Sequence, residues 1–487
     1  MILKDILGNI DFTCNGTLEK EITEISTDSR NVNKNTIYFA LLGTKTDGQN
    51  FINDVIEKGC EVVFCEKNWL KENTLNSNVT YIGVENRQKD FAQLSSNFYS
   101  NPTKDMIMIG VTGTNGKTTS THLIENILKD NGKNTGIIGT LYSRYAGKTI
   151  TAKFTTPMAN ELQKTFKDMK DNNVDSVIME VSSHALKQYR VGACNYKVVV
   201  FSNLTQDHLD YHHTFDDYRE SKGILFSELS DENSFSIINR DDPSANYFSE
   251  ISKGKVITYG LNDNADIYAS NIELKMDGTS FLVTTKKGSI QLDLILVGKF
   301  NIYNSLSALA VGYALGISLE DCKKSLEKTS GIAGRIEIVT PKGHPFTVVV
   351  DYAHTPDSLE NILKSSREFT KNNLICVFGC GGDRDRTKRP IMGGIAEKLS
   401  DIPVVTSDNP RTEDPDFIIS QILEGMNNNA NIIVEVDRKN AIKRAIESAK
   451  DGDTVVIAGK GHEDYQIFKD KTIHFDDREI AREFLKK

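Results

Sequence analysis

A glycine-rich loop that ends in a lysine and two threonines is the part of this sequence best suited to chemistry. It reads Gly110-Val-Thr-Gly-Thr-Asn-Gly-Lys-Thr-Thr119, with an apolar run before it and a helix-like run after it. Such a loop and the positive end of its helix bind a polyphosphate, which Lys117 reaches while the Thr118 hydroxyl binds the accompanying Mg²⁺. The spacing is not the generic one, because Val111 stands six residues before Lys117. The flanking strand and helix still favour a phosphate loop over an ordinary glycine-rich turn.

A carboxylate and a histidine after two later apolar runs are candidates for the metal site. Glu180 ends the run Asp175-Ser-Val-Ile-Met-Glu180, and a carboxylate there can hold Mg²⁺, which favours oxygen ligands beside phosphates. His208 follows another apolar run, 196–201. Spacing alone favours a hydrogen-bonded structural histidine over a metal ligand at this position, so both interpretations stay open.

Three polar loops follow predicted strands in the last third of the chain. They are Gly379-Cys-Gly-Gly-Asp-Arg-Asp-Arg-Thr-Lys-Arg-Pro390, Asp408-Asn-Pro-Arg411 and Gly459-Lys-Gly-His-Glu463. Each alone could be an ordinary solvated loop, although the cations behind the glycines of the first favour anion binding. Because ligands of parallel sheets bind at the carboxyl ends of the strands, three such loops at one sheet edge indicate a binding site.

The strands that position these residues predict an α/β fold with mostly parallel sheets. Apolar strands alternate with helices in the middle and last third, and a period-two pattern in 267–297 predicts a few antiparallel strands. At roughly 150 residues a domain, 487 residues suggest about three domains. The linker Asn97-Phe-Tyr-Ser-Asn-Pro-Thr103 and the glycines near 331 place the domains at 1–102, 103–331 and 332–487.

Composition and charge exclude several classes of protein. The net charge of −9 argues against a general nucleic-acid surface. The charged start Met1-Ile-Leu-Lys-Asp5 is unlike a signal peptide, and no stretch approaches about 18 apolar residues. Seven scattered cysteines without a Cys-x-x-Cys pair argue against a zinc site or a disulfide framework and favour a reduced compartment. We therefore expect a cytoplasmic protein with neither a membrane span nor a nucleic-acid partner.

An ordered set of motifs resembles the Mur ligases, and among them the branch that adds diaminopimelate. The motifs span nearly the whole chain, in the order Thr112-Gly-Thr-Asn-Gly-Lys-Thr-Thr119, Glu180-Val-Ser-Ser-His184, Gln206-Asp-His-Leu-Asp210, Asp351-Tyr-Ala-His-Thr-Pro356 and Asp408-Asn-Pro-Arg411. The resemblance implies a smaller α/β N-terminal domain for the UDP end of a substrate. It also implies a central ATPase domain with a mostly parallel sheet and a C-terminal Rossmann-like domain that brings the amino acid.

The activity implied by this resemblance is an ATP-dependent ligation in peptidoglycan precursor synthesis. ATP would phosphorylate the free D-glutamate carboxylate of UDP-MurNAc-L-Ala-D-Glu, and the amine of meso-diaminopimelate would attack the acyl phosphate. Because two anions must meet, cations must surround them and water must be kept from the acyl phosphate. ATP and Mg²⁺ are the expected cofactors, the two small-molecule substrates are the expected partners, and we expect a monomer.

The resemblance also assigns roles to individual residues. The expected ATP contacts are Gly113, Thr114, Asn115, Gly116, Lys117, Thr118, Thr119, Asn301, Arg335 and Asp351. The expected metal ligands are Thr118, Glu180, His208 and a carbamylated Lys222. The expected contacts to the UDP-muramoyl dipeptide are Ser29, Thr155, Thr156, Ser182 and Arg190. The expected diaminopimelate contacts are Arg384, Asp408, Asn409, Pro410, Arg411, Gly459 and Glu463. The expected catalytic residues are Lys117, Lys222 and His208.

Two of these assignments go beyond what the residue types suggest. By itself a helical lysine such as Lys222 is a solvated surface group, whereas a carbamate formed on it with CO₂ could bind a second Mg²⁺. Arg411 would select diaminopimelate over lysine, because the two differ by a distal carboxylate and arginine offers a planar fork for it. Pro410 would stiffen that turn, and Glu463 would face the distal ammonium.

Three other functions compete with this one. A GTPase-type switch also uses a phosphate loop, but the sequence has no Asn-Lys-x-Asp guanine reader. A folate polyglutamylation ligase shares the ATPase architecture and the chemistry, but not the Asp408-Asn-Pro-Arg411 loop. A non-enzymatic nucleotide-binding module would not need so many polar loops at strand ends.

Overall fold

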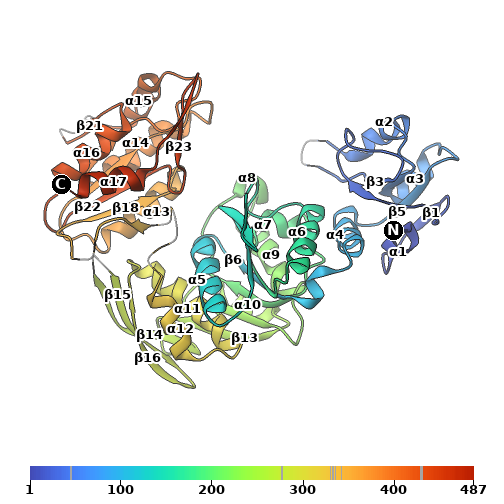
Figure 1. Cartoon of the computed structure of the whole chain (residues 1–487), viewed down its shortest axis with the longest axis horizontal. Helices are drawn as coiled ribbons and strands as arrows, with labels where there is room; N and C mark the ends of the chain where they lie inside the picture. Colours follow the sequence, from blue (N-terminus) through green and yellow to red (C-terminus); the bar gives the residue numbers. More distant parts are fainter. Residues whose placement is uncertain are drawn as a thin grey trace. The chain divides into compact units, whose positions relative to one another are not determined.

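The computed structural model of the chain is mixed α/β, as predicted from the sequence (Figure 1). It describes residues 1–43, 46–275, 278–329, 331, 334, 336–341, 343–427 and 431–486. The described residues fall into two compact units, Met1–Tyr259 with Ala310–Ile317 and Gly260–Leu309 with Ser318–Lys487.

The first sheet of the first unit has the strand order β1-β5-β4-β3-β2. Its strands are β1 (Thr13–Asn15), β2 (Glu24–Ser26), β3 (Thr36–Phe39), β4 (Val62–Glu66) and β5 (Thr80–Val84), parallel except for β1. The helices of this segment are α1 (Leu3–Leu7), η1 (Gly48–Phe51), α2 (Ile52–Glu57), α3 (Lys67–Glu72) and α4 (Arg87–Phe98). Ile37 and Phe39 enter one apolar core and Tyr38 another. Strand β3, which holds these three residues, is therefore apolar on both sides, because both faces of the sheet are covered.

The second sheet of the first unit carries the phosphate loop. Within this unit its order is β13-β12-β11-β6-β10-β7-β8-β9, with β8 and β9 antiparallel. The strands are β6 (Ile107–Thr112), β7 (Thr135–Ile138), β8 (Tyr142–Tyr145), β9 (Lys148–Thr151), β10 (Ser176–Glu180), β11 (Tyr196–Phe201), β12 (Phe235–Asn239) and β13 (Lys255–Gly260). The register pairs Val111 with Glu180 and Thr112 with Phe201. The carboxyl ends of β6, β10 and β11 therefore lie side by side.

Helices connect these parallel strands, as a βαβ pattern requires. They are η2 (Pro102–Asp105), α5 (Lys117–Asp130), α6 (Ala159–Asp171), α7 (Ser183–Lys187), α8 (Leu209–His212), α9 (Phe215–Ser227) and α10 (Ala245–Ile251). Phe166 of α6, Phe226 of α9 and Phe248 of α10 pack in one core with Phe201 of β11. This core holds the strand that ends beside the phosphate loop.

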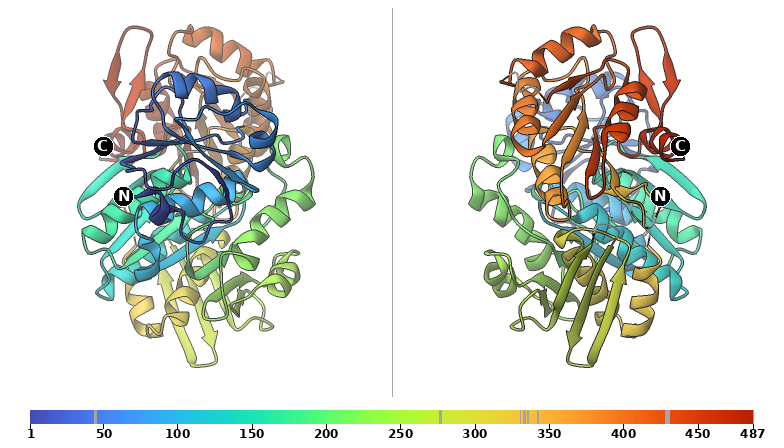
Figure 2. Two further views of the ribbon diagram at one scale, coloured as in Figure 1. Left: turned by 90° about the vertical axis from the view of Figure 1, so that its right-hand side faces the viewer. Right: turned by 90° about the vertical axis from the view of Figure 1, so that its left-hand side faces the viewer.

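The second unit begins with the antiparallel strands β14 (Ile267–Lys275), β15 (Gly278–Thr285) and β16 (Gly288–Leu294), drawn as long yellow-green arrows in Figure 2. They confirm the antiparallel strands predicted from the period-two pattern, since buried and half-buried side chains alternate along β15. Helices α11 (Lys299–Ala314) and α12 (Leu319–Glu327) follow in the chain.

A second mostly parallel sheet forms the rest of this unit, with the order β17-β18-β22-β19-β20-β21 and β17 antiparallel. Its strands are β17 (Glu337–Ile338), β18 (Thr347–Asp351), β19 (Leu374–Phe378), β20 (Ile402–Val405), β21 (Ile433–Val434) and β22 (Thr454–Ala458). The hairpin β23 (Tyr465–Ile467) and β24 (Thr472–His474) follows. The helices are α13 (Pro356–Arg367), α14 (Lys388–Leu399), α15 (Pro415–Leu423), α16 (Arg438–Ser448) and α17 (Asp477–Leu485).

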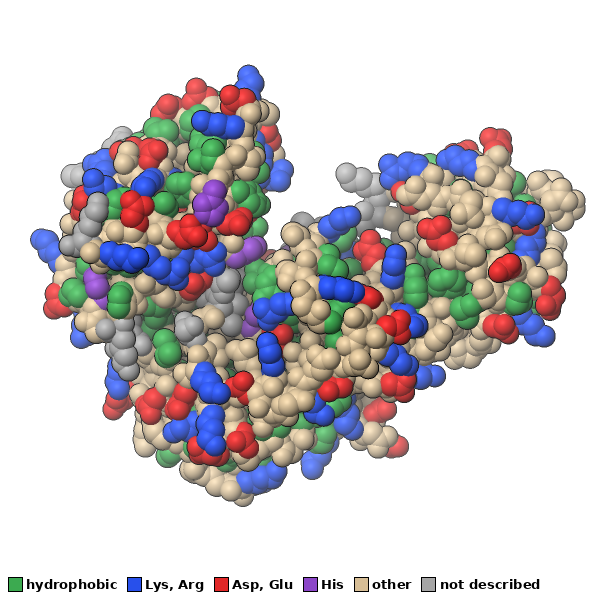
Figure 3. Space-filling model, in the orientation of Figure 1, with side chains coloured by type: hydrophobic (Ala, Val, Ile, Leu, Met, Phe, Trp, Pro, Cys, Tyr) green, Lys and Arg blue, Asp and Glu red, His purple; other side chains and the backbone are tan. Residues whose placement is uncertain are grey.

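Charged side chains of both signs are interspersed over the face of the molecule in Figure 3. This mixing matches a composition of 58 basic and 67 acidic residues. Salt screens such exposed charges beyond about 10 Å, so their fields act locally. Within the described ranges, no helix has both the length and the apolar character needed to cross a membrane.

Candidate active site

The phosphate loop lies between β6 and α5, where the sequence predicted it. Gly113 and Gly116 have positive φ angles of 146° and 83°, which glycine adopts without strain. A side chain at Gly113 would also overlap the Ser202 hydroxyl just after β11. That hydroxyl donates to the carbonyl of Asn115 at 2.7 Å. The loop is therefore fastened to the neighbouring strand end.

Two ammonium groups contact the same backbone carbonyl of this loop. Lys117 Nζ donates to Gly113 O at 2.9 Å and to Thr114 O at 2.8 Å, and Lys222 Nζ donates to Gly113 O at 3.0 Å. Lys222 is only 2% exposed and lies 4.4 Å from the centre of the Tyr218 ring. Burial, and then the Lys117 charge, hold the pKa of Lys222 well below its usual value. The expectation from residue type alone, a solvated surface lysine, is wrong.

Glu180 is the buried last residue of β10, the strand beside β6. Its carboxylate accepts hydrogen bonds from Thr140 N at 2.9 Å and Thr140 Oγ1 at 3.0 Å. Thr118, in the first turn of α5, is buried as well. A carboxylate and a hydroxyl near a phosphate loop are oxygen donors that fit Mg²⁺, which usually keeps water and phosphate oxygens as its other ligands. The described residues contain no group of three or more His, Cys, Asp and Glu side chains that could hold a metal alone.

His208 lies in the loop after β11 and has a positive φ of 53°. Its side chain is 48% exposed, with Nε2 3.4 Å from Asp207 Oδ2. Its ring meets that of His184 edge-on, with centroids 4.9 Å apart. The side chain is therefore open to solvent, unlike that of a buried structural histidine. Its role as a metal ligand stays a prediction.

Four of the five predicted contacts to the muramoyl dipeptide lie in one cluster beside the end of β10: Thr155, Thr156, Ser182 and Arg190. The Thr155 hydroxyl lies 3.2 Å from that of Thr140, which donates to Glu180. The Thr156 hydroxyl donates to Glu180 O at 2.9 Å and accepts from Ser182 N at 3.1 Å. Arg190 Nη1 donates to Thr156 O at 2.9 Å. Ser29 follows β2 and so belongs to the other sheet of the first unit.

Two further predicted nucleotide contacts, Asn301 and Asp351, belong to the second unit. A third, Arg335, lies outside the described residues. Asn301 is buried in α11 and donates to the carbonyl four residues earlier at 2.9 Å. Asp351 ends β18, and its carboxylate accepts from Ile336 N and Ala353 N, each at 2.8 Å. Both side chains are thus ordered by local hydrogen bonds, and their nucleotide contacts stay predictions.

The three polar loops of the C-terminal sheet meet at its carboxyl edge, as predicted. They follow β22, β19 and β20, which are neighbours in that order. Gly382 N donates to Asn409 O at 2.9 Å, and Asn409 Nδ2 donates to Glu463 Oε2 at 3.0 Å. A Cβ atom on Gly459 would lie 2.6 Å from Asp408 Oδ2. Each loop is therefore in contact with another.

Arg411 supplies a cation to this edge. Its backbone has a positive φ of 53°, and its Nη1 donates to Gly382 O at 2.8 Å. A Cβ on Gly381 would lie 2.9 Å from Arg411 Nη1 and 3.8 Å from Arg384 Cγ, so both predicted arginines border the same glycine turn. The edge thus combines arginine guanidinium groups with the Glu463 carboxylate. Such a set of charges matches a ligand that carries both a carboxylate and an ammonium.

Buried cations that the sequence analysis did not select hold these loops. Lys460 is fully buried, and its Nζ contacts Asn409 Oδ1 at 3.0 Å. Arg438 at the start of α16 is fully buried against Asp477, with its Nη2 2.7 Å from Oδ2. Lys460 lies inside the motif Gly459-Lys-Gly-His-Glu463, but lysine is rarely fully buried, so its type gave no signal.

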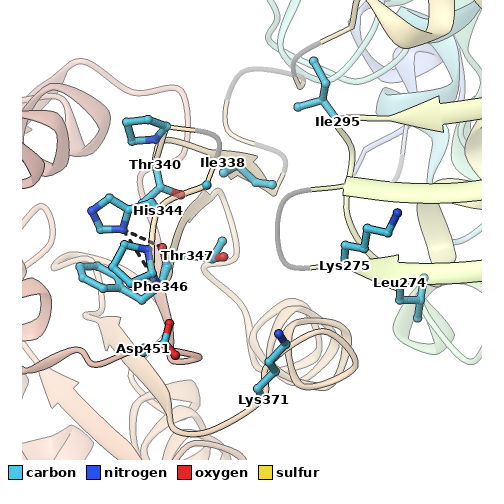
Figure 4. Close-up of a pocket in the computed structure, with 13 residues that line it drawn as sticks. Leu274, Lys275, Ile295, Ile338, Thr340, His344, Phe346, Thr347, Lys371 and Asp451 are labelled. Carbon is cyan, nitrogen blue, oxygen red and sulfur yellow. Dashed lines mark hydrogen bonds between the residues drawn. The ribbon is translucent and has the colours of Figure 1, made fainter.

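A separate pocket of about 530 Å³ lies in the second unit, lined by residues of β14 and of the segments 338–341 and 343–347 (Figure 4). His344 Nδ1 lies 3.0 Å from Phe346 O on its wall. Lys275 and Lys371 also line it. None of the residues predicted to act in catalysis or binding is among its lining residues. The pocket is thus distinct from the sites above.

Sequence models of Mur ligase domains match three successive segments. The Mur ligase family, catalytic domain, matches residues 21–99; the Mur ligase middle domain matches 111–312; and the Mur ligase, glutamate ligase domain, matches 334–461. The last two cover the residues Gly113–Thr119 of the phosphate loop and all six strands of the C-terminal sheet.

Similar proteins agree over the whole length. The UDP-N-acetylmuramoyl-L-alanyl-D-glutamate–2,6-diaminopimelate ligase of Clostridium tetani is 46% identical over 100% of this chain and 99% of its own. The ligase of the same name from Clostridium botulinum is 46% identical over 100% of both chains. A solved structure of a ligase with this name has a TM-score of 0.73 and 31% identity and covers 100% of this chain and 99% of its own. A folylpolyglutamate synthase of Mycobacterium tuberculosis shares the fold at 17% identity, with a TM-score of 0.61 and coverage of 82% and 95%. From its phosphate loop to its C-terminal sheet edge, the chain belongs to the Mur ligase family.

Proposed function

We propose that this protein is the ATP-dependent ligase that joins meso-2,6-diaminopimelate to UDP-N-acetylmuramoyl-L-alanyl-D-glutamate in peptidoglycan precursor synthesis. The names of its 46% identical relatives support the reaction. The observation that carries the choice of amino acid is the linked arrangement of Arg411, Asn409 and Glu463 at one sheet edge. A ligand held there meets a guanidinium group and a carboxylate.

Diaminopimelate fits this edge better than lysine does. Its distal end carries both an ammonium and a carboxylate, whereas that of lysine carries only the ammonium. In the proposal Arg411 binds the distal carboxylate through two parallel N–H donors, and Glu463 binds the ammonium. Arg384, Asp408, Asn409, Pro410 and Gly459 complete the pocket.

The proposed reaction activates a carboxylate, which is otherwise a poor electrophile. The D-glutamate carboxylate attacks the terminal phosphorus of ATP, and ADP leaves. The diaminopimelate amine then attacks the acyl carbon, and the tetrahedral intermediate loses phosphate and a proton to give the amide. Lys117, bound across the loop, reduces the repulsion between the two anions. Gly113–Thr119, Asn301, Arg335 and Asp351 would hold the nucleotide.

Mg²⁺ would neutralise phosphate charge in this reaction. Thr118, Glu180 and His208 would hold one Mg²⁺, and a carbamylated Lys222 would bind a second. The amine of Lys222 would add to the carbon of CO₂ and release a proton, which gives a carbamate anion. The burial of Lys222 and its contact with Gly113 O, which Lys117 also contacts, support this step. At present two ammonium groups, those of Lys117 and Lys222, lie beside the same carbonyl. A carbamate on Lys222 would turn this pair of like charges into an ion pair with Lys117.

We assign the substrates to three domains. Residues 1–102 would bind the UDP end through Ser29, and 103–331 would bind ATP and hold the dipeptide with the cluster of Thr155, Thr156, Ser182 and Arg190. Residues 332–487 would bring the amino acid. The separate sheets of the first unit and the C-terminal sheet of the second support this division. We further propose a monomer that acts in the cytoplasm, where ATP is available.

Phosphate release tests this function. With ATP, Mg²⁺ and the UDP-muramoyl dipeptide, diaminopimelate should give phosphate release and a tripeptide product detected by mass, whereas lysine should give far less. A reduced folate with glutamate serves as the alternative pair of substrates, since the folylpolyglutamate synthase shares the fold. Phosphate release with the folate pair and none with diaminopimelate would overturn the proposal.

A further inference from the structure

The side chain of Lys460 lies inside the C-terminal sheet edge instead of on its surface. It is 0% exposed, although lysine is among the residues least often fully buried. Its Nζ donates to Asn409 Oδ1 at 3.0 Å, to Tyr465 O at 2.6 Å and to Glu463 Oε2 at 3.4 Å. An ammonium has three N–H donors, so these acceptors match it in number.

These contacts fix the orientation of the Asn409 amide. Its Oδ1 accepts from both Lys460 Nζ and Ile467 N, each at 3.0 Å. Its Nδ2 must therefore face the opposite way, and it donates to Glu463 Oε2 at 3.0 Å. The orientation is set by these donors, because an amide rotated by 180° would place its N–H groups against them.

Glu463 is in turn held through one oxygen. Oε2 accepts from Lys460 Nζ and from Asn409 Nδ2, and neither contact uses Oε1. In the proposed site, Oε1 is the carboxylate oxygen that would face the ammonium of the ligand. Lys460 thus supplies the buried ammonium that pairs with the Glu463 carboxylate, with Nζ 3.4 Å from Oε2.

We propose that Lys460 is a positioning residue for the amino-acid substrate, because its buried ammonium orients Asn409 and holds the Glu463 carboxylate that reads the distal ammonium. This inference rests on the proposed function and deepens it. Lys460 acts through Asn409 and Glu463, and it contacts no substrate itself. Its removal should therefore weaken the binding of the amino acid and leave the binding of ATP and of the UDP substrate unchanged.

Lys460→Met tests this role, with Lys469→Met as the matched control, since Lys469 is an exposed lysine on the turn after β23. We expect KM for diaminopimelate to rise about tenfold or more in Lys460→Met, which is about 1.4 kcal/mol or more. The kcat value and the KM values for ATP and the UDP substrate should stay within about twofold, and Lys469→Met should match the unmodified protein. If Lys460→Met does not fold, Lys460→Gln, which keeps a donor for Asn409, should show the same split.

A double-substitution cycle with Glu463→Gln separates positioning from general destabilisation. In the Glu463→Gln background, Lys460→Met should raise KM for diaminopimelate by much less than in the unmodified protein. An equal rise in both backgrounds, or an equal rise in KM for all three substrates, would overturn the proposal.

Crystal structures separate this inference from the proposed function. If the unmodified protein does not ligate diaminopimelate, the proposed function fails, but the role of Lys460 can still be decided. Structures of the unmodified protein and of Lys460→Met should then show that Asn409 Nδ2 and Glu463 Oε2 lose their hydrogen bond. An unchanged Asn409–Glu463 pair in the variant would overturn the positioning role.

Discussion

The Lys117 ammonium donates to the carbonyls of Gly113 and Thr114 and so places a positive charge in the phosphate loop. Lys117→Ala should fold but lose turnover by about 10²- to 10³-fold, because one preorganised donor to the reacting phosphate is lost. Phosphate release with both substrates measures the loss, and circular dichroism checks the fold. Lys129→Ala, an exposed lysine of the same helix, is the control. Near-normal ligation by Lys117→Ala would rule out the assigned role.

Lys222 offers a second test at the scale of one side chain. Burial lowers the pKa of its ammonium, so more of the side chain is an uncharged amine near neutral pH, the form that adds CO₂. Lys222→Ala should lose activity and recover part of it with a short carboxylic acid, which replaces the carbamate oxygens. Activity is measured with and without the acid, with Lys117→Ala as a variant that should not recover. A plain ammonium in the structure of the active, metal-loaded protein would contradict carbamylation.

Arg411 should decide which diamino acid is used. Removing one partner of a desolvated charge pair costs roughly 2–5 kcal/mol, or tens- to thousands-fold in selectivity. Arg411→Ala should therefore lower kcat/KM for diaminopimelate by that range and leave KM for ATP unchanged. Competition between diaminopimelate and lysine measures the selectivity directly. Equal kcat/KM for the two amino acids in the unmodified protein would refute this assignment.

The lysines show where reasoning from residue types ends. The flanking strand and helix predicted that Lys117 begins the helix after the glycine loop, and it lies there, while its phosphate contact stays a prediction. Lys222 and Lys460 are buried, whereas an isolated lysine in a sequence is best explained as a surface group. Their burial depends on Gly113 and Asn409, which lie 109 and 51 residues away along the chain. No local pattern encodes contacts of that separation.

At the scale of elements, Arg438 at the start of α16 joins the end of β22 to the start of α17. Its guanidinium donates to Ala458 O at 3.1 Å and forms a buried pair with Asp477. Arg438→Met would leave Asp477 buried without a cation, which should cost about 3–5 kcal/mol in the free energy of unfolding. Multi-domain chains need not unfold in one step, so calorimetry should show a lower transition for the second unit only.

Lys439→Met is the control for this variant, because Lys439 forms an exposed pair with Glu483. Exposed pairs contribute about 0–1 kcal/mol, so its transitions should move little. Equal shifts for Arg438→Met and Lys439→Met would show that the buried pair does not stabilise the unit.

The elements themselves were largely predictable. The apolar runs 175–180 and 196–201 became β10 and β11, within one residue of the bounds that the sequence suggests, because strands covered on both faces are apolar throughout. The apolar run Thr36-Ile-Tyr-Phe-Ala-Leu-Leu42 predicts a longer strand than β3, which ends at Phe39. Ala40 N still donates to Phe64 O of β4, but Leu41 O accepts from Gly48 N, so the chain leaves the ladder at Leu41. Turn contacts of this kind leave no periodic pattern.

For the whole molecule, charge sets the expected behaviour in solution. The net charge is −9 at pH 7 and the calculated isoelectric point is about 5.6, with both signs interspersed on the face in Figure 3. Solubility should therefore be lowest near pH 5.6, where repulsion between molecules is weakest. Light scattering across a pH series at fixed salt measures this. A flat response between pH 5 and 8 would show that charge does not control association.

Neighbouring side chains of a strand covered on both faces enter two different cores. This alternation limits where residues can be inserted into or deleted from such a strand. In β3, Ile37 and Phe39 enter one core and Tyr38 enters the other. One inserted codon would turn every later side chain of the strand to the opposite face. Point substitutions that keep a residue apolar should thus be far better tolerated there than an insertion or deletion of one residue. Natural length differences between homologues should accumulate at exposed turns such as Ala146-Gly147, between β8 and β9, where no such inversion follows.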